Sequence, residues 1–462
     1  MGWRFMYSKI PNYSVEKKEA IDVLCKEFIK NNHIEPNLFS SLNVKRGLRN
    51  SDGTGVLAGL TLICNVHGYV IDEGEKKPEE GKLIYRNYKI NDIIDDCVET
   101  KRFGFEEVIY LLLFGSLPKE KDVEYFKSVL AMYRELPEGF LEDVILKRPS
   151  KDIMNKMQSA LLMLYTYDDL ADVITIEQEL RKAIEIIARM SNIMICAYQA
   201  KCRAFEKRSL VVHSINKQEN IAQSILSTLR LDRKYTFEEA SLLDILLMLH
   251  AEHGGGNNST FTCRCLTSTG TDAYSAYAGA IGSLKGPKHG GANIKVMYMM
   301  KDIEKNVKDW NDLDEIENYL KKILEKKAGD KSGLIYGMGH AVYTKSDPRA
   351  VILKKAANKL AKGTEFEKKI KLIENVENVT SKIFLKNNST KSVISANVDM
   401  YSGFVYNMLG IPPDLYTPLF ATARIAGWAA HRMEELLTAK RIIRPAYKPI
   451  NKELEYVAMK ER

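Results

Sequence analysis

Four of the eight histidines in the chain stand close together in its second half, each beside glycines or at the end of an expected helix. They are His250, His253, His289 and His340. A neutral imidazole can donate a hydrogen bond to a carbonyl group, and it can also move a proton near neutral pH. This grouping indicates acid–base or carbonyl chemistry and is the first functional signal in the sequence.

The first two of these histidines end a helix that is expected to begin at Thr236. Thr236 and Glu239 form a capping box at its start. Three- and four-residue spacing places His250 on the same stripe as three leucines of this helix. We therefore interpret His250 as a hydrogen-bonded core residue, and His253, which precedes Gly254, as the histidine that is freer to face a cleft.

The other two histidines lie in glycine-rich turns. In GPKHGGAN, His289 stands just before a helix expected from about Asn293, whose dipole would lower the pKa of the imidazole and keep it neutral. In YGMGHAVYTKSDPRA, His340 follows two glycines that permit close backbone approach. Asp347 is expected to cap a helix with Arg349 in its first turn. Spacing alone leaves Arg349 open between a surface residue and a site residue.

Two isolated charges stand in apolar helical segments. Asp399 is the only charge between Lys391 and Asp414, and Arg424 is the only charge between Asp414 and His431. Such charges cost several kcal/mol when buried unless they are paired or used. Taken by themselves, the residues favour a buried ion pair between the two. A pair of functional groups is the alternative.

The elements that must position these groups are mostly helices. Apolar residues at helical spacing recur along the chain, and β-branched residues with turn glycines predict strands near 55–90. A glycine-rich belt from 254 to 291 gives way to a lysine-rich helical stretch. The sequence thus predicts a mainly all-α fold with a large domain from 1–291 and 392–462 and a small domain from 292–391. The clearest helical segments are 15–30, 121–136, 176–190, 238–250, 314–327 and 349–362.

Composition excludes several classes of function. The net charge is +8 over 462 residues, but the lysines alternate with acids in solvated helix faces, so we expect no nucleic-acid partner. The longest uncharged stretch, 53–71, carries four glycines and is no membrane segment. The N-terminus lacks a signal or transit pattern. Seven cysteines without a CxxC pair fit a reduced compartment. We therefore expect a cytoplasmic protein without a membrane partner.

Six motifs stand in the order and approximate spacing of a known family. They are HAEHGGGNNSTFTCR, GPKHGGAN, GMGHAVYTKSDPRA, NVDMYSG, ATARIAGW and IIRP. The chain resembles the citrate synthases over nearly its whole length, since KRGLRNSDGTGVLAGLT and GKLIYRNYKINDI also match. The resemblance implies a two-domain helical homodimer whose cleft closes over substrate. It implies condensation of acetyl-CoA with oxaloacetate on the si face, with no cofactor and no metal.

The resemblance also implies roles for site residues. Asp399 would remove a methyl proton from acetyl-CoA, His289 would donate to the thioester carbonyl, and His340 would polarise the ketone of oxaloacetate. Enol stabilisation must accompany proton removal, because the α-proton of a thioester is far less acidic than a carboxylic acid. Arginine forks match the two carboxylates of oxaloacetate. The groups implied to hold them are His253, Arg349, Arg424 and, reaching the site of the partner subunit, Arg444.

A further set of residues is implied to bind CoA, mostly through the backbone of one loop. Family members often carry a lysine or arginine facing the CoA phosphates where this chain has Thr344, and the neighbouring Lys345 would take over that contact. The implied CoA-binding residues are Gly337, Met338, Gly339, Ala341, Val342 and Lys345.

Three alternatives remain open from sequence. A 2-methylcitrate synthase, using propionyl-CoA, has the same catalytic residues, and one methylene changes binding by only about 1–3 kcal/mol. A metalloenzyme would use His250 and His253 with Cys263 and Cys265 as zinc ligands, although neither spacing is typical of zinc sites. A helical interaction protein that kept the fold without activity is the third.

Overall fold

In a computed structural model of the chain, the described residues are 15–72, 75–387, 394–438 and 441–462. Those up to residue 60 pack into one compact unit and those from 61 to 462 into another. The first unit holds only short elements, which are α1 (Val15–Asn31), α2 (Asn37–Ser41) and a 3-10 helix (Arg46–Leu48). All the predicted site residues belong to the second unit.

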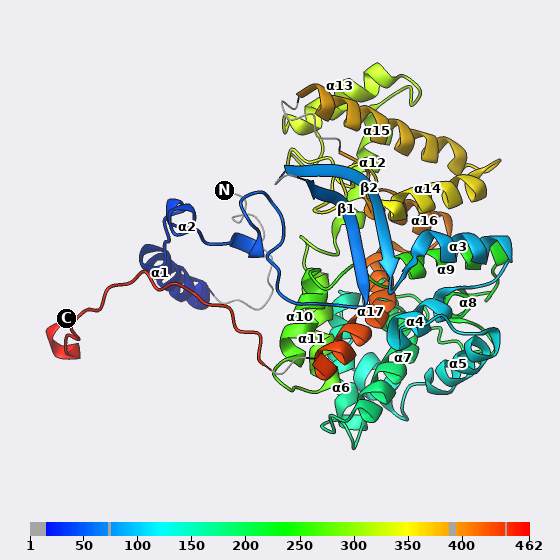
Figure 1. Ribbon diagram of the computed structural model, residues 1–462, viewed down its shortest axis with the longest axis horizontal. Helices are drawn as coiled ribbons and strands as arrows, with labels where there is room; N and C mark the ends of the chain where they lie inside the picture. Colours follow the sequence, from blue (N-terminus) through cyan, green and yellow to red (C-terminus); the bar gives the residue numbers. More distant parts are fainter. Residues whose placement is uncertain (1–14, 73–74, 388–393, 439–440) are drawn as a thin grey trace. The chain divides into compact units, whose positions relative to one another are not determined.

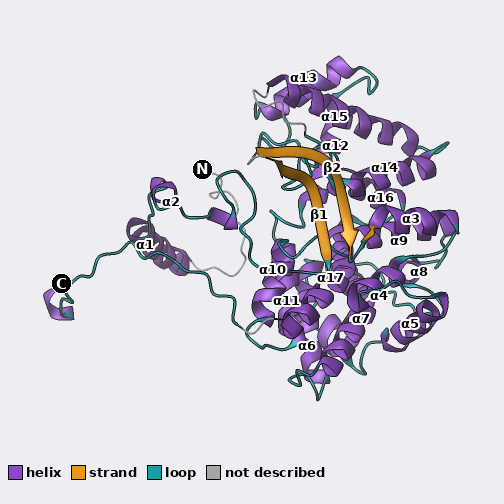
Figure 2. Cartoon of the chain, viewed as in Figure 1, coloured by secondary structure: helices purple, strands orange, loops and turns teal. Residues whose placement is uncertain are grey.

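Helices dominate the second unit, as predicted (Figures 1 and 2). Every helical segment predicted from periodicity is found, so the mainly all-α fold class is confirmed. The division into a large domain and a small domain at 292 and 391 stays a prediction. The helices are α3 (Ile90–Glu99), α4 (Phe105–Phe114), α5 (Glu120–Tyr133), α6 (Ile153–Leu164), α7 (Ile176–Glu206), α8 (Ile221–Leu229), α9 (Phe237–His250), α10 (Asn258–Thr267), α11 (Ala273–Lys285), α12 (Ala292–Asn306), α13 (Leu313–Leu324), α14 (Pro348–Ala361), α15 (Phe366–Asn387), α16 (Val398–Met408) and α17 (Tyr416–Thr438).

Four short elements complete the described part of this unit. Two are 3-10 turns at Tyr165–Tyr167 and Pro413–Leu415, one is a π-helical turn at Leu141–Leu146, and the last is a 3-10 turn at Met459–Glu461. The first of these turns continues α6 toward α7. They serve mainly as connections between the long helices.

The strands form a small antiparallel sheet in the order β1-β2-β3, drawn in orange in Figure 2. Its strands are β1 (Cys64–Asp72), β2 (Glu75–Tyr85) and β3 (Tyr88–Lys89), and Cys64 pairs with Tyr85. The predicted β element is therefore confirmed, but it begins at Cys64. Residues 53–63 form no strand apart from an isolated bridge at Gly55, because they have no partner strand beside them and contain three flexible glycines.

Side-chain caps set the helix starts that matter for the site. Thr236 and Glu239 make both hydrogen bonds of the capping box of α9. Asp347 accepts a hydrogen bond from the backbone N–H of Arg349 at the start of α14, as predicted. Helix α12 begins at Ala292, one residue before the predicted start. These local rules could be read from the sequence because each involves residues only two or three positions apart.

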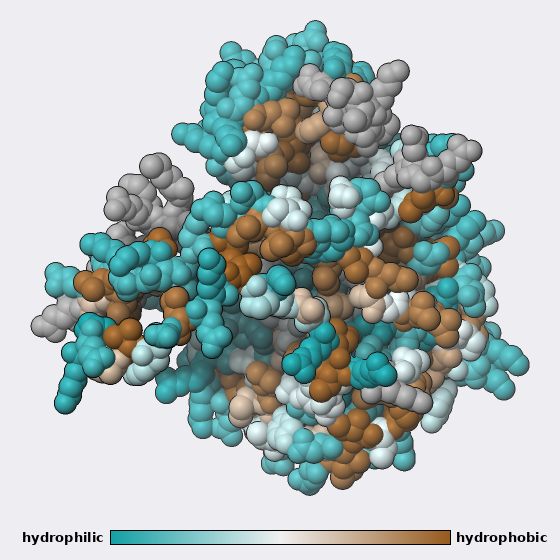
Figure 3. Space-filling view, turned by 60° about the vertical axis from the view of Figure 1, so that its left-hand side comes forward, coloured by the Kyte–Doolittle hydropathy of each residue, from teal (hydrophilic) through white to brown (hydrophobic). Residues whose placement is uncertain are grey.

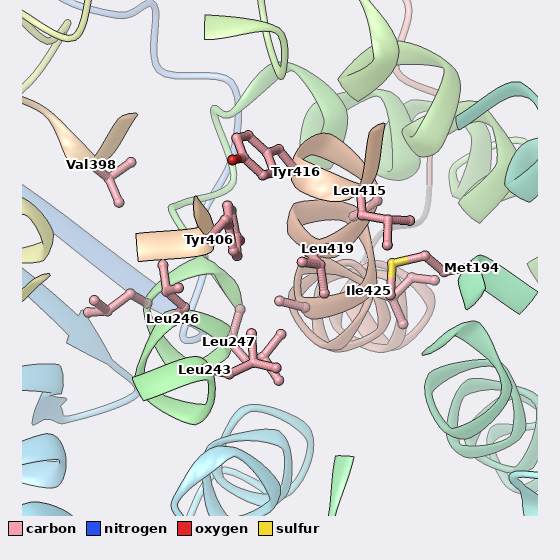
Figure 4. Packing of buried hydrophobic residues seen from close by; sticks show 14 of the residues in the cluster. Met194, Leu243, Leu246, Leu247, Val398, Tyr406, Leu415, Tyr416, Leu419 and Ile425 are labelled. Atoms are coloured by element: carbon pink, nitrogen blue, oxygen red, sulfur yellow. The ribbon is translucent and has the colours of Figure 1, made fainter. Parts of the chain in front are cut away.

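Helix α9 is the central helix of the core. Every residue from Leu242 to His250 is buried, so the leucine stripe predicted from spacing is one part of a helix covered on all sides. Figure 4 shows its leucines facing side chains of α16 and α17, among them Leu419 and Tyr406. Helix α9 packs against both of these helices. The core thus joins the elements that carry His250, Asp399 and Arg424.

The surface of the chain is mixed in character. Figure 3 shows apolar patches between hydrophilic residues on the face in view. None of the described helices combines the length and the apolar character that crossing a membrane requires. All seven cysteines are free thiols.

Candidate active site

The sheet anchors the loop that follows α9. The hydroxyl of Tyr85, at the end of β2, lies 2.9 Å from the carbonyl oxygen of Met248 and 3.0 Å from that of Glu252. The backbone N–H of Glu252 also donates to this hydroxyl, at 3.2 Å. Tyr85 is fully buried. Strand β2 therefore fixes the turn that presents His253.

The sheet also supports the loop that carries His340. A Cβ atom added at Gly68 would lie 2.7 Å from the carbonyl oxygen of Val342, and one at Gly81 would lie 2.1 Å from that of Ser346. The hydroxyl of Thr344 donates to the carbonyl oxygen of Gly68 at 2.7 Å. The two glycines let the hairpin pack directly on the backbone of this loop.

His250 is fully buried, as predicted, with its ring against Phe420 at a centroid distance of 4.4 Å. The prediction that it is hydrogen-bonded is wrong, since neither ring nitrogen has a partner within the described part of the chain. Burial, followed by the charges of Arg424 and Arg349, holds the pKa of His250 well below its usual value. The ring is therefore neutral.

His253 lies in a group of three rings. Its centroid is 5.0 Å from that of His340 and 5.6 Å from that of Tyr343. Nδ1 of His340 accepts hydrogen bonds from the backbone N–H groups of Val342 and Tyr343, each at 3.1 Å. Because Nδ1 is an acceptor, the ring proton of His340 is on Nε2. That nitrogen can then donate to a carbonyl oxygen.

Arg349 is a buried site residue and not a surface arginine, with 4% of its surface exposed. Its Nε and Nη2 atoms bind the two carboxylate oxygens of Asp347, at 3.0 and 2.8 Å. Asp347 also accepts from the backbone N–H of Val398 at 3.2 Å. This carboxylate thus caps α14, orients Arg349 and ties α14 to the start of α16.

The ion pair between Asp399 and Arg424, favoured from the residues alone, is not formed among the described residues. Nε of Arg424 donates to the carbonyl oxygen of His250 at 2.6 Å, while Nη1 and Nη2 have no partner there. Arg349 is the cation that acts on Asp399. The sequence could not reveal this, because Asp399 and Arg424 lie on different helices, α16 and α17, and spacing carries no information on which elements meet.

Asp399 occupies the first turn of α16, where Asn397 is the N-cap and accepts its backbone N–H at 3.0 Å. Burial by the surrounding protein raises the pKa of Asp399 to about 6, and the positive charge of Arg349 opposes that rise. The predicted increase in basicity by desolvation is confirmed. A carboxylate of this kind is ionised at neutral pH and is a stronger base than one in water.

His289 lies before α12, and its Nε2 atom is 3.1 Å from the hydroxyl of Ser259. The same hydroxyl lies 3.3 Å from the indole nitrogen of Trp428 and 2.9 Å from Oδ1 of Asn257. A hydroxyl can both donate and accept, so Ser259 fixes the orientation of the ring. The pKa of His289 is lowered to about 4, first by burial and then by the charge of Arg424. The neutral ring predicted from sequence is confirmed, but burial is its main cause.

The predicted CoA loop lies against the start of α16. Gly337 and Gly339 have φ angles of +82° and +84°, and a Cβ atom at Gly337 would lie 3.0 Å from Cα of Met400. The carbonyl oxygen of Gly337 accepts from the backbone N–H of Asn397 at 2.8 Å, and that of Gly339 accepts from its side chain at 2.8 Å. The predicted close backbone approach is thus present. Met338 and Val342 are half-buried, while Ala341 and Lys345 are exposed.

Arg444 is the one predicted site residue that this chain does not bring to the group. It is exposed, and within the described residues it has no hydrogen bond or ion pair with the others. The proposed zinc set is not assembled either. Among the described residues no three side chains of the metal-binding types gather, and the thiol of Cys263 faces the carbonyl oxygen of Trp428 at 3.8 Å.

Sequence reasoning missed several residues that hold the site together. Ser259 lies inside a recognised motif but was not singled out, and Asp347 was taken only as a helix cap. Glu252 stands between His250 and His253, and His431 ends the apolar segment that contains Arg424. A search for every charged or histidine residue in an apolar segment would have found the last two.

Comparisons with known proteins agree with this geometry. The sequence profile described as "Citrate synthase, C-terminal domain" matches residues 52–446. A 2-methylcitrate synthase of Corynebacterium glutamicum is 31% identical and covers 92% of this chain and 100% of the relative. A citrate synthase of Haloferax volcanii is 33% identical, with coverages of 91% and 99%.

Solved structures match as well. Citrate synthase from Thermotoga maritima has a TM-score of 0.70 and 28% identity, covering 91% of this chain and 99% of that chain. Thermoplasma acidophilum citrate synthase in a ternary complex with carboxymethyl coenzyme A and oxaloacetate has a TM-score of 0.72 and 26% identity, with the same coverages. The chain belongs to the citrate synthase family.

Proposed function

We propose that the chain is a citrate synthase that condenses acetyl-CoA with oxaloacetate and water, releasing citrate and CoA. The observation that carries this proposal is a pair of buried arginines. Arg349 and Arg424 lie close enough for their charges to repel each other, and two terminal nitrogens of Arg424 have no partner within the described residues. A ligand with two carboxylates resolves both problems at once.

Three groups supply the chemistry. Asp399 takes a methyl proton from acetyl-CoA while His289 donates a hydrogen bond to the thioester oxygen, which stabilises the enol. The hydroxyl of Ser259 donates to Oδ1 of Asn257; when it turns to donate to Nε2 of His289 instead, the ring proton is on Nδ1 and can form this bond. His340, with its proton on Nε2, polarises the ketone of oxaloacetate and then protonates the alkoxide. The contacts of His289 and His340 and the raised pKa of Asp399 support these roles.

The substrate carboxylates are held by Arg349, Arg424 and His253. Asp347 holds Arg349 in a two-bond fork, so this arginine is fixed before substrate arrives. His253 remains neutral because burial and neighbouring charges lower its pKa. It can therefore donate or accept without adding a third positive charge. The thioester is bound along the loop from Gly337 to Val342, with Lys345 near the phosphates.

The test is a thiol-release assay with oxaloacetate, comparing acetyl-CoA with propionyl-CoA. We expect faster release with acetyl-CoA and loss of release in Asp399→Ala. Propionyl-CoA is the specific alternative acyl substrate, because one of the relatives above is named as a 2-methylcitrate synthase. A preference for propionyl-CoA would assign that activity instead. No oxaloacetate-dependent release from either thioester would refute both.

We also propose that the enzyme works as a homodimer in the cytoplasm, with Arg444 completing the site of the partner subunit. The exposure of Arg444 supports this, and so does a row of exposed apolar side chains from α6 to the start of α7. Free thiols fit a reducing compartment. The exposed apolar residues of that row are Leu162, Met163, Tyr165, Tyr167, Leu170, Val173, Ile174 and Ile176.

A mixture of two inactive variants tests the shared site. Arg444→Ala should inactivate the site of its partner, and Asp399→Ala should inactivate its own. A statistical mixture, formed by refolding the two together, should regain roughly a quarter of wild-type activity, since half the dimers are mixed and each has one intact site. Absence of recovery, with dimers verified by sedimentation, would mean that Arg444 acts within its own chain.

A further inference from the structure

A second buried charged cluster stands directly behind the substrate-binding groups. It contains Glu252 and His431, both with no exposed surface, and Arg264, with 9% exposed. Glu434 and Glu435 complete it by pairing with Arg264. None of these five residues has a role in the chemistry described above. The cluster is nevertheless adjacent to it, because Glu252 directly precedes His253.

Glu252 joins two elements of the site. Its Oε1 atom accepts from the backbone N–H of Gly254 and from Nε2 of His431, the latter at 3.0 Å. The first bond lies in the loop that presents His253, and the second reaches helix α17, which carries Arg424. The carboxylate fits here because α17 has a glycine opposite it. A Cβ atom at Gly427 would lie 2.1 Å from Oε2 of Glu252.

The orientation of His431 follows from the groups around its ring. Nε and Nη2 of Arg264 lie 3.1 and 2.8 Å from Nδ1 of His431. A guanidinium group can only donate, so Nδ1 accepts and the ring proton is on Nε2. Nε2 then donates to Glu252. Arg264 is itself held by Glu435, 2.6 Å from Nη1, and by Glu434. Each member thus fixes the next, ending at Glu252.

The charge of Glu252 also matters at the site. Burial alone would raise its pKa, but the contact with His431 and the charge of Arg424 hold the pKa below its usual value. Glu252 is in turn the acidic group with the largest effect on Arg424. An ionised carboxylate therefore lies behind the arginine that presents free nitrogens to the substrate. Because Arg424 lies between Glu252 and the substrate, the Glu252 carboxylate repels the substrate carboxylates only weakly. It still offsets part of the buried positive charge of Arg424.

We propose that Glu252, oriented by His431, is a positioning residue that sets His253 and Arg424 relative to each other for binding of a dicarboxylate substrate. The proposal rests on the proposed function. The Glu252–His431 bond is the side-chain link between the loop after α9 and helix α17, beside the backbone bond from the N–H of Gly427 to the carbonyl oxygen of Ala251, and these two elements carry His253 and Arg424. Loss of this link should impair oxaloacetate binding. The thioester loop and Asp399 lie on other elements, so acetyl-CoA binding should change little.

Steady-state kinetics of Glu252→Ala and Glu252→Gln test the proposal. Glu252→Ala should raise the KM for oxaloacetate roughly 10- to 100-fold, the cost typical of a displaced binding group. Its KM for acetyl-CoA should stay within about threefold of wild type, since that loop is untouched. Glu252→Gln keeps an oxygen that accepts from both Gly254 and His431, and it should restore a KM for oxaloacetate near that of wild type.

The pairing with His431 is tested by a double-variant cycle. His431→Leu should raise the KM for oxaloacetate in the same way, because Glu252 loses its orienting donor. Adding His431→Leu to Glu252→Ala should raise the KM little further, since the two residues act through one bond. Full additivity of the two effects on KM would overturn the proposal.

A matched control comes from the next residue of the same helix. Arg432 forms a buried ion pair with Glu179, at 2.6 Å with both side chains unexposed. This pair faces α7 and touches none of the substrate-binding residues. Glu179→Ala should lower the melting temperature without changing the KM for oxaloacetate. If Glu252→Ala lowers only the melting temperature, as the control does, Glu252 is merely structural and the proposal fails.

Two further measurements separate failure of the proposal from failure of the proposed function. Calorimetric titration of oxaloacetate into wild type should give binding, and thiol release should follow. Wild type that neither binds nor turns over oxaloacetate would overturn the function and this inference together. Normal wild type with unchanged binding in Glu252→Ala overturns the inference alone. If Glu252→Ala does not fold, Glu252→Asp replaces it, because the shorter carboxylate cannot reach both donors. It should raise the KM about tenfold, and an unchanged KM would refute the proposal.

Discussion

Helix α17 carries two fully buried arginines, eight residues apart, in opposite electrostatic situations. Every arm of Arg432 is bound, its three nitrogens contacting Glu179 (2.6 Å), Thr267 (3.1 Å) and Thr271 (2.8 Å). Arg424 uses only Nε, and its two terminal nitrogens have no partner among the described residues. Both side chains have 0% exposed surface. Burial is therefore the same, and the two arginines differ in their hydrogen bonds and in the ion pair with Glu179 that Arg432 alone forms.

The contrast shows how one helix serves both structure and function. A buried donor without a partner costs about 1–3 kcal/mol, and more when it is charged. A fold tolerates that cost where a ligand completes the bonds. Arg432 belongs to the stable frame that connects α17 to α7. Arg424 has incomplete hydrogen bonding where α17 passes the end of α9, and there the substrate supplies the missing acceptors.

Replacing each arginine by methionine should give the largest effects, on catalysis for Arg424 and on stability for Arg432. Arg424→Met should reduce kcat/KM for oxaloacetate by about 10²- to 10⁴-fold, while stability stays the same or rises because an incompletely bonded charge is removed. Arg432→Met breaks the pair with Glu179, which keeps only its second cation, Lys182, so it should cost about 2–4 kcal/mol of unfolding free energy. Thiol release and urea unfolding measure the two effects.

The comparison breaks if Arg424→Met destabilises the chain as strongly as Arg432→Met. That result would mean that Arg424 is a structural cation whose balance with Glu252 the fold requires. Arg424→Lys sharpens the functional side of the test. It keeps the charge but loses the planar fork, so it should recover little of the lost kcat/KM.

The pH dependence of Asp399 should give the next largest effect. Its pKa is raised from 3.8 to about 6, so kcat/KM should fall about tenfold for each pH unit below 6 as the base becomes protonated. The folded state holds this proton more tightly than the unfolded state. The stability that Asp399 contributes is therefore present at low pH and lost as pH rises through about 6.

Asp399→Asn provides the check. This variant should have no turnover. Its free energy of unfolding should nevertheless exceed that of wild type by about 1–3 kcal/mol at pH 8, and this difference should disappear near pH 4. Thermal unfolding across this range measures it. His289, whose pKa is lowered to about 4, stays neutral above about pH 5 and does not produce a fall in activity that begins near pH 6. An equal gain at both pH values would show that desolvation of Asp399 is not its source.

The two ends of α9 differ in the same way as the two arginines, one being structural and the other leading into the site. Thr236 and Glu239 satisfy the first turn by local bonds, whereas the other end leads into the substrate loop. Thr236→Ala should cost about 1 kcal/mol of stability and leave the KM for oxaloacetate unchanged. Urea unfolding beside steady-state kinetics would detect it. A raised KM would mean that strain at the start of α9 is transmitted to His253.

Local patterns made much of the fold predictable. Helix periodicity placed α5, α7 and α13, and the Asp347 cap and the Thr236 capping box were readable because each joins neighbours in sequence. The β element was placed too early because residues 53–63 have suitable composition but no strand beside them. Strand formation depends on a partner, and partners are not visible in local composition.

Contacts between residues far apart in the sequence could not be predicted in the same way. The predicted pair of Asp399 and Arg424 failed since the cation acting on Asp399 is Arg349. Likewise, Glu252 and His431 are 179 positions apart, and only the packing of the loop onto Gly427 brings them together. The residue types were informative, but which residue meets which is decided by how the helices pack. Resemblance to the family supplied what spacing could not.

The smallest expected effect concerns two adjacent residues at the predicted CoA phosphates. Thr344 is satisfied by the carbonyl oxygen of Gly68, while Lys345 is exposed. If Lys345 provides the phosphate contact, Lys345→Ala should raise the KM for acetyl-CoA about threefold at low salt, and the difference should fade as ionic strength rises and screens exposed charges. Thr344→Val should leave that KM unchanged, because its hydroxyl is already bonded within the protein. Titrating salt in the thiol-release assay for both variants decides between them. A salt-independent loss in Thr344→Val would instead show that support of the loop by the hairpin, and not charge, governs CoA binding here.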